Sequence, residues 1–168
     1  MIYLKTNPVG IDIQIQRMQE YLYDKLNTSW GCDINAYGRA YIDEDNDTSI
    51  KPIVFKGGVD YKEVLTDDKV DAQFFFVEEN SETISNSCIS SNNLNLIFIV
   101  NDLRKVKGSV THYADEEIKE EVKSYIKSFW EMQSVIKGKD SLDGFDVSQL
   151  KFLYPYFVFK ISGSINNY

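Results

Sequence analysis

Apolar residues recur along this chain at two different spacings, and the change in spacing separates helices from strands. After Asn7 and Pro8, which suit a helix start, apolar residues repeat every three or four positions as far as Asn27. They mark one face of a first helix: Ile11, Ile15, Met18, Leu22 and Leu26. A similar stripe predicts a second helix within residues 114–130: Ala114, Ile118, Val122, Ile126 and Phe129 with Trp130.

Short runs rich in β-branched and aromatic residues lie between and after these helices, and they predict strands. The runs occupy residues 35–42, 49–55, 71–79, 93–102, 131–139 and 154–165. Because proline cannot donate a backbone hydrogen bond, Pro52 places its run at a sheet edge or at a strand start. The order of elements predicts one α+β domain over residues 1–168, with two helices packed on a mostly antiparallel sheet.

The stretch "ENSETISNSCISSNN", residues 79–93, separates two of these runs. It is polar and rich in residues that favour turns, and it contains few apolar side chains. The composition predicts a long surface loop or an extended arm.

Aromatic residues make up 14% of the chain and are concentrated in the predicted strands. The run of three phenylalanines at residues 74–76 puts apolar side chains on both faces of its strand, so both faces need a cover. Either the helices and a curled sheet supply it, or a second subunit does, in an oligomer whose sheets continue or stack between subunits. The second possibility predicts interface residues at Tyr37, Arg39, Phe75 and Tyr156.

Four acidic residues fall within five positions of the stretch "AYIDEDNDTSIKPIVF": Asp43, Glu44, Asp45 and Asp47. The spacing matches the first ligands of an EF-hand loop, which also requires a glycine at its sixth position and a glutamate at its twelfth. Thr48 and Val54 stand at those positions, and the flanking residues favour strands. The stretch therefore predicts a solvated acidic loop between two strands, with a patch of negative potential and no calcium site.

The formal net charge of −8 excludes most nucleic-acid readers and proteins that bind acidic membranes, because such a surface repels phosphate groups. DNA can still pass close to this surface without binding to it. No apolar run is long enough to span a bilayer, and the first residues lack the features of a signal peptide.

Residues that carry catalytic chemistry are few. His112 is the single histidine, and no nucleophile or set of metal ligands accompanies it in a recognisable pattern. Cys32 and Cys88 are widely spaced and lack the flanking residues of catalytic cysteines, so we expect reduced thiols. The sequence predicts no enzyme, no cofactor and no metal.

The run "NAYGRAYIDEDNDTSIKPIVFKGGVDYKEVLTDDKVDAQFFFVEE" gives the order of elements a further meaning. An amphipathic helix leads to a strand with "YGR", a variable turn, "KP" before an apolar strand, "YKEVL" and a Phe-rich strand, and a helix and more strands follow. This arrangement resembles head-to-tail connector proteins of tailed bacteriophages, particularly those with a tail-terminator (tail-completion) fold. It is similar to the neck ring proteins of crAss-like phages.

The resemblance implies a structural virion protein, assembled in the host cytoplasm as a homo-oligomeric ring of six or twelve copies. Its partners would be portal or adaptor proteins and tail proteins, and DNA would pass through the ring transiently. An acidic lumen would let DNA slide by like-charge repulsion. Asp43, Glu44, Asp45 and Asp47 are the candidates to face the lumen or a neighbouring ring.

Two other hypotheses remain at this stage. An acidic soluble binding adaptor, such as a DNA mimic or anti-defence protein, would use the same net charge to bind a basic partner. A small hydrolase or transferase would rely on carboxylates or His112 in a pocket.

Overall fold

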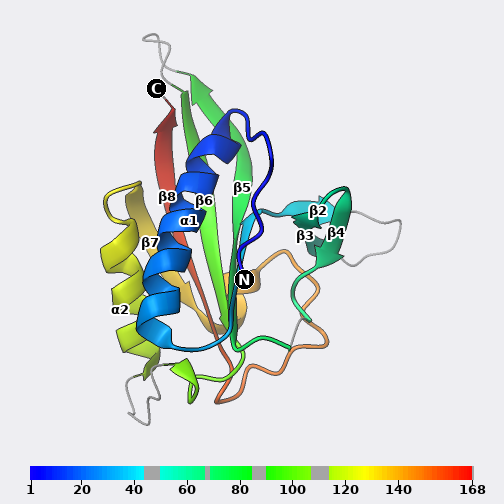
Figure 1. Cartoon of the computed structure of the whole chain (residues 1–168), viewed down its shortest axis with the longest axis vertical. Coiled ribbons are helices and arrows are strands. Elements are labelled where there is room, and N and C mark those ends of the chain that lie inside the picture. The colour runs from blue at the N-terminus through cyan, green and yellow to red at the C-terminus, as the bar shows by residue number, and fades with distance from the viewer. Residues whose placement is uncertain (44–49, 67–68, 85–89, 107–113, 168) are drawn as a thin grey trace.

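The computed structural model describes residues 1–43, 50–66, 69–84, 90–106 and 114–167. Within these ranges, a five-stranded sheet with the order β1-β5-β6-β8-β7 forms the centre of the fold (Figure 1). Its strands are β1 (Ile34–Arg39), β5 (Ala72–Ile84), β6 (Ser90–Val100), β7 (Glu131–Lys137) and β8 (Phe157–Asn167). A smaller sheet contains β2 (Tyr41–Asp43), β3 (Lys51–Gly57) and β4 (Asp60–Glu63).

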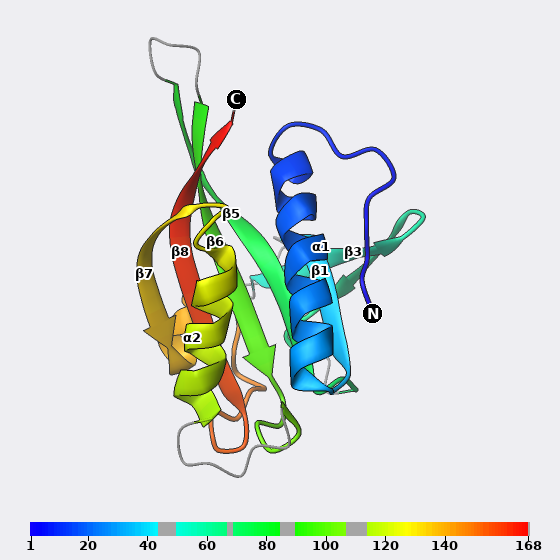
Figure 2. The ribbon, with the colours of Figure 1, turned by 60° about the vertical axis from the view of Figure 1, so that its left-hand side comes forward.

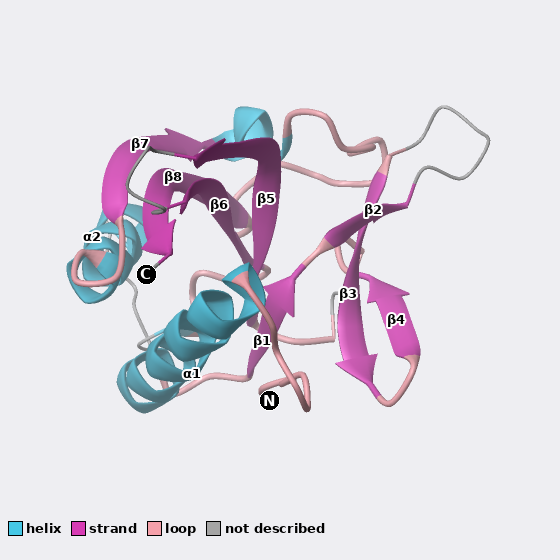
Figure 3. Ribbon diagram, turned by 90° about the horizontal axis from the view of Figure 1, so that it is seen from above, coloured by secondary structure: helices cyan, strands magenta, loops and turns pink. Residues whose placement is uncertain are grey.

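The described pairings confirm the predicted α+β fold with a mostly antiparallel sheet. β1 runs parallel to β5, and every other neighbouring pair in the two sheets is antiparallel. The helices α1 (Ile11–Trp30) and α2 (Ala114–Ile126) lie side by side on one face of the large sheet (Figures 2 and 3). The short 3₁₀ helix η2 (Gly138–Leu142) follows β7.

Helix α1 buries the apolar face that its sequence predicts, but its ends differ from the prediction. All five stripe residues are buried, four of them with at most 1% exposure. The helix begins at Ile11 after Gly10, not at Asn7, and it continues past Asn27 to Trp30. Gly31 ends it in the left-handed conformation, with φ of 62°, which glycine adopts without a steric penalty.

The core between the helices and the sheet is built from alternate residues of each strand. Phe74 and Phe76 of β5 point to this side and pack with Phe98 of β6, which stacks on Phe159 of β8 with ring centroids 5.0 Å apart. The α2 stripe completes this core, as the sequence predicts: Ala114, Ile118, Val122 and Ile126 are all buried. The helix ends at Ile126 and not at residue 130 as predicted, so the buried Trp130 lies in the turn before β7.

The opposite face of the large sheet is covered by the same chain. Phe75, which points away from the helices, packs with Val54 of β3, Val64 after β4, Leu142 of η2 and Val158 of β8. The small sheet and the connector between β7 and β8 therefore form a second layer (Figure 3). This covering answers the question raised by the three phenylalanines in favour of a two-sided core within one chain.

The predicted arm at residues 79–93 is largely strand. β5 and β6 stay paired as far as Ile84 and Ser90, and β6 stays paired with β8 as far as Asn167. The three strands form a ribbon that extends past both helices (Figures 1 and 2). Backbone pairing with β8 supplies hydrogen bonds that the turn-favouring side chains do not reveal, and so tertiary context overrides local propensity. Residues 85–89 lie outside the described part.

Pro52 is the second residue of β3, the central strand of the small sheet. Of the two positions predicted for it, the strand start is therefore correct and the sheet edge is not. Its carbonyl still accepts a hydrogen bond from the Val64 N–H at 3.3 Å, because proline lacks only the donor.

Gly163 of β8 provides a test of how closely β7 packs on β8. A Cβ atom at this position would lie 2.5 Å from the carbonyl oxygen of Glu131, which belongs to the backbone of β7. We expect Gly163→Ala to lower the free energy of unfolding by about 1–3 kcal/mol, the usual cost of overpacking. Urea denaturation measures this change.

Gly38→Ala is the matched control for that variant. Its Cβ atom would meet only the movable Oε1 atom of Gln19, at 3.4 Å. An equal loss of stability in both variants would contradict a specific clash at Gly163.

Candidate functional site

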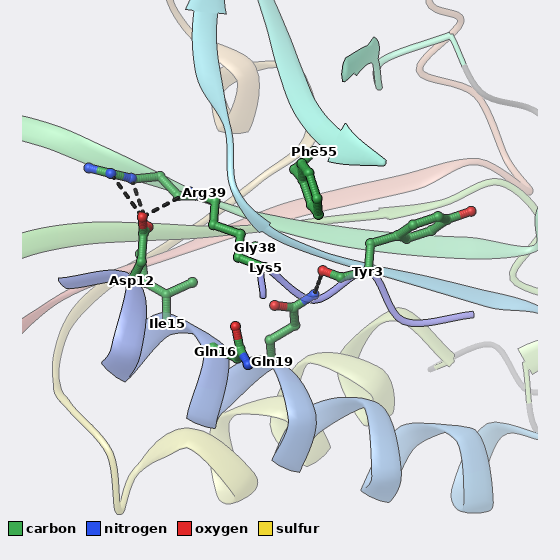
Figure 4. Close-up of a pocket in the computed structure, with 9 residues that line it drawn as sticks. All are labelled: Tyr3, Lys5, Asp12, Ile15, Gln16, Gln19, Gly38, Arg39 and Phe55. Atoms are coloured by element: carbon green, nitrogen blue, oxygen red, sulfur yellow. Dashed lines mark hydrogen bonds and ion pairs between the residues drawn. The ribbon is translucent and has the colours of Figure 1, made fainter. Parts of the chain in front are cut away.

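Four charged side chains from four separate segments meet near the N-terminal end of α1. They are Lys5, Asp12, Arg39 and Glu78, named here the charge cluster. Lys5 precedes α1, Asp12 lies in its first turn, Arg39 ends β1, and Glu78 lies in β5 where the ribbon begins (Figure 4 shows the first three).

Asp12 is the centre of the charge cluster, with a side chain only 9% exposed. Its Oδ2 atom accepts hydrogen bonds from Lys5 Nζ at 2.8 Å and from an Arg39 terminal nitrogen at 3.1 Å. Its Oδ1 atom lies 3.0 Å from Arg39 Nε, in ion-pair contact but not aligned for a hydrogen bond. Arg39 also donates to Glu78. The Asp12 carboxylate thus binds two cations, and one of them, Arg39, also contacts Glu78 of β5.

Tyr41 of β2 connects the charge cluster to the small sheet. Lys5 Nζ donates to its hydroxyl at 2.7 Å, and the Arg39 guanidinium lies 5.2 Å from its ring centroid. The Tyr41 ring meets Tyr61 of β4 edge to face, at 5.7 Å. The cations therefore fix the position of the small sheet as well as that of α1.

Polar contacts continue from the charge cluster into the ribbon. Asn92 of β6 donates to Glu78 at 2.7 Å, and Asn95 donates to Glu79 at 3.1 Å. Ser162 of β8 donates in turn to Asn95 at 2.5 Å. The start of the ribbon is thus linked across β5, β6 and β8 by side chains as well as by backbone pairing.

The cavity beside the charge cluster is too small for a substrate. Its volume is about 10 Å³, close to the lower limit for one water molecule. Gln19 fills part of this space and donates to the carbonyl oxygens of Tyr3 and Ala36, at 2.8 and 2.9 Å (Figure 4 shows the bond to Tyr3). The site is suited to holding three segments together.

The electrostatics of the charge cluster oppose a role in proton transfer. Burial lowers the pKa of Lys5, but its hydrogen bonds to Asp12 and Tyr41 outweigh burial and raise the pKa above the ordinary value. Lys5 therefore stays an ammonium at neutral pH.

The four residues predicted at a subunit interface have different surroundings. Tyr37 and Phe75 are fully buried in the core opposite the helices, and so have no surface to offer another subunit. Tyr37 stacks on Tyr3 at 4.8 Å. Tyr156 packs half-buried against the same core, and burial raises the pKa of its hydroxyl. Arg39 belongs to the charge cluster.

The acidic stretch lies mostly beyond the described residues. Asp43 is the last residue of β2, aligned with Lys51 of β3, whereas Glu44, Asp45 and Asp47 fall outside. His112 and Cys88 also fall outside. Among the described residues, no group of three or more His, Cys, Asp or Glu side chains is placed to hold a metal ion.

Two open clefts share Thr66 and Val70, which lie between β4 and β5, among their lining residues. One has a volume of about 720 Å³ and combines the Asp71–Lys105 ion pair with the exposed Leu153 and Tyr154. The other, of about 460 Å³, includes Asn35 among its lining residues. In the second cleft, the Thr66 hydroxyl donates a hydrogen bond to the Glu63 carboxylate at 2.5 Å. In the described part of the chain, no helix has the length and apolar character needed to cross a membrane.

No protein-family model matches this chain, and no curated protein or solved structure matches it. Its function is therefore inferred from its own residues and their arrangement.

Sequence reasoning found Arg39 but missed its partners. Asp12 interrupts an apolar helix start, and an acidic residue in a first turn is ordinarily explained by the helix dipole. Lys5 and Glu78 gave no signal, because their contacts join segments that are far apart along the chain.

We expect two Asp→Asn substitutions, one inside the charge cluster and one outside it, to lower the stability of the fold by different amounts. Asp12→Asn removes the common partner of Lys5 and Arg39, and we expect a loss of about 1–3 kcal/mol, between the values for exposed and buried ion pairs. Asp102→Asn removes the partner of Arg104, whose side chain is 59% exposed, and we expect almost no change. Chemical denaturation in low and high salt measures both, and equal effects would contradict a stabilising role for the charge cluster.

We expect the thiol of Cys32 to be alkylated slowly at neutral pH. Burial, with help from Asp71 and Asp33, raises its pKa from 9.0 to about 11. The thiolate is the reactive form, so alkylation at pH 7 should be about a hundredfold slower than for an ordinary thiol. In a Cys88→Ser variant, the iodoacetamide rate should still rise between pH 9 and 10, and a plateau below pH 9 would contradict the prediction.

Proposed function

We propose that this chain is a ring-forming structural subunit of the neck or tail of a tailed bacteriophage. In that role it joins the portal vertex to the tail and lets DNA pass through the ring. The proposal combines the resemblance to head-to-tail connector proteins with the architecture of the chain, and no enzymatic activity is part of it.

The observation that carries the proposal is the β5-β6-β8 ribbon. It extends past the helices, and the pairing of β6 with β8 continues as far as Ser90 and Asn167 (Figure 1). A ribbon of this length is not needed to close the core, which lies between the helices and the small sheet. An ordered projection beside a complete core suits a protein whose task is to contact neighbouring copies.

The net charge supports the same role. A surface with a formal charge of −8 repels phosphate groups, so DNA that moves through a ring of such subunits meets no strong binding site. A protein that reads or holds DNA would require the opposite balance.

The deciding experiment is to search for the protein in intact phage particles. We expect quantitative mass spectrometry of purified virions to find six or twelve copies per particle, and antibody labelling to place them between head and tail. Absence from intact particles would overturn the proposal. Salt-sensitive binding of a monomer or dimer to a basic host protein would favour the acidic adaptor in its place.

Light scattering and negative-stain images of the purified chain add an independent prediction. We expect the mass to correspond to six or twelve subunits at high protein concentration, with annular particles in the images. Turnover of a substrate by the isolated chain would contradict a purely structural role.

A further inference from the structure

We propose that the upper part of β5 pairs with β7 of a second copy, so that the large sheet continues from one subunit to the next. This inference rests on the proposed function, because it states how the ring closes. The surface on β5 comprises residues 77–84 together with an apolar patch formed by Leu4, Val9 and Ile13. The name "docking edge" is used for it below.

The docking edge begins where β1 ends. β1 pairs with β5 only as far as Phe76, and the chain then turns away after Ala40, whose N–H donates to the Phe76 carbonyl at 2.7 Å. The other side of β5 pairs with β6 up to Ile84, with a register shift between Glu78 and Glu82. Within the described residues, no strand occupies the outer side of β5 above Phe76. Unpaired edges of this length invite another strand.

Exposed apolar residues occur at and before the start of α1. Leu4, Val9 and Ile13 are 38%, 74% and 39% exposed, and Ile13 lies in the first turn of α1. Asp12, the neighbour of Ile13, reaches Glu78 of β5 through Arg39. The charge cluster therefore ties the first turn of α1, which carries Ile13, to β5. A partner that pairs with β5 and covers the patch buries backbone and apolar groups together.

β7 is the other open edge of the same sheet. It pairs with β8 on one side, and it is last in the strand order of the described chain. The successive antiparallel pairings make β7 antiparallel to β5. Rotation about an axis along the strands would bring β7 of one copy to β5 of the next in antiparallel pairing, and such head-to-tail contacts close into rings.

The helix layer would continue across the same contact. α2 lies on the face of the sheet that carries α1, and its Glu116 contacts Lys137 of β7 (Figures 2 and 3). A neighbouring β7 would therefore bring its own α2 beside the start of α1. The neighbouring α2 would then cover the exposed side chains of Val9 and Ile13.

Charge argues against pairing between two docking edges. The edge contains Glu78 and Glu79, and a symmetric contact would bring these like charges together. β7 carries one acidic and one basic residue, Glu131 and Lys137, with uncharged residues between them. Of these two candidate partners, β7 is the one that avoids the repulsion.

The pairing requires a stagger along the strands. Through β8 and β6, Lys137 of β7 is level with Phe74 of β5, below the start of the docking edge. Closed sheets accommodate such a stagger by tilting their strands relative to the axis of closure. Strands tilted from the ring axis are therefore part of the inference.

Two substitutions at exposed valines test the apolar patch. We expect Val9→Glu to weaken self-association at least about tenfold, because it places a charge in the contact and among like charges. Val59→Glu is the matched control, since Val59 is 91% exposed in the β3–β4 turn, and we expect it to leave the oligomer unchanged. Circular dichroism checks that both variants fold, and light scattering over a concentration series gives the masses.

Disulfide trapping tests the pairing of strands directly. In a Cys32→Ser, Cys88→Ser background, a chain with both Glu79→Cys and Ser134→Cys should oxidise to a ladder of multimers ending at the ring size. A mixture of the two single variants should stop at dimers, because a head-to-tail contact joins unlike positions.

A chain that stays monomeric at all concentrations would overturn the inference. An oligomer that survives Val9→Glu and forms no disulfide between β5 and β7 would overturn it too. Either result is separate from the proposed function, which is decided by the presence of the protein in particles.

Discussion

The fold depends on one constraint, which is that strand β5, between β1 and β6 in the large sheet, is apolar on both faces. Phe74 and Phe76 require a cover on one side, and Phe75 requires one on the other, since neighbouring residues of a strand point in opposite directions. The helices provide the first cover. The second consists of the small sheet and the connector after β7, and this explains why the chain leaves the large sheet after β1 and returns to it at β5.

A layered fold of this kind needs fixed joints where the chain passes between layers. One joint is the charge cluster, which ties α1, β1, β5 and the small sheet through Asp12 and Arg39. Another joins the two helices, where Glu121 of α2 accepts hydrogen bonds from Trp30 of α1 and from Tyr125, both at 3.0 Å. Both joints place a carboxylate among several donors, so that a partly buried charge stays satisfied.

The helices and the apolar strands could be predicted from sequence because their signals are local. The stripes of α1 and α2 repeat with the helical period, and the runs at 71–79 and 93–102 correspond to β5 and β6. The extension of those strands through residues 79–84 and 90–93 could not be found in this way. Its Ser and Asn residues favour turns when taken alone, and they form strand because β8 lies alongside.

The candidate site was least predictable because its members share no sequence pattern. The sequence suggested Tyr37 and Phe75 as residues of a subunit interface. The structure buries both in the core beneath the small sheet, a layer that follows only from the three-dimensional path of the chain. Their burial also limits how copies of this chain can associate. In the core, the helices cover one face of the large sheet, and the small sheet with the connector after β7 covers the other. The cover that the three phenylalanines of β5 require is therefore supplied within one chain, and a second subunit is not needed to bury them.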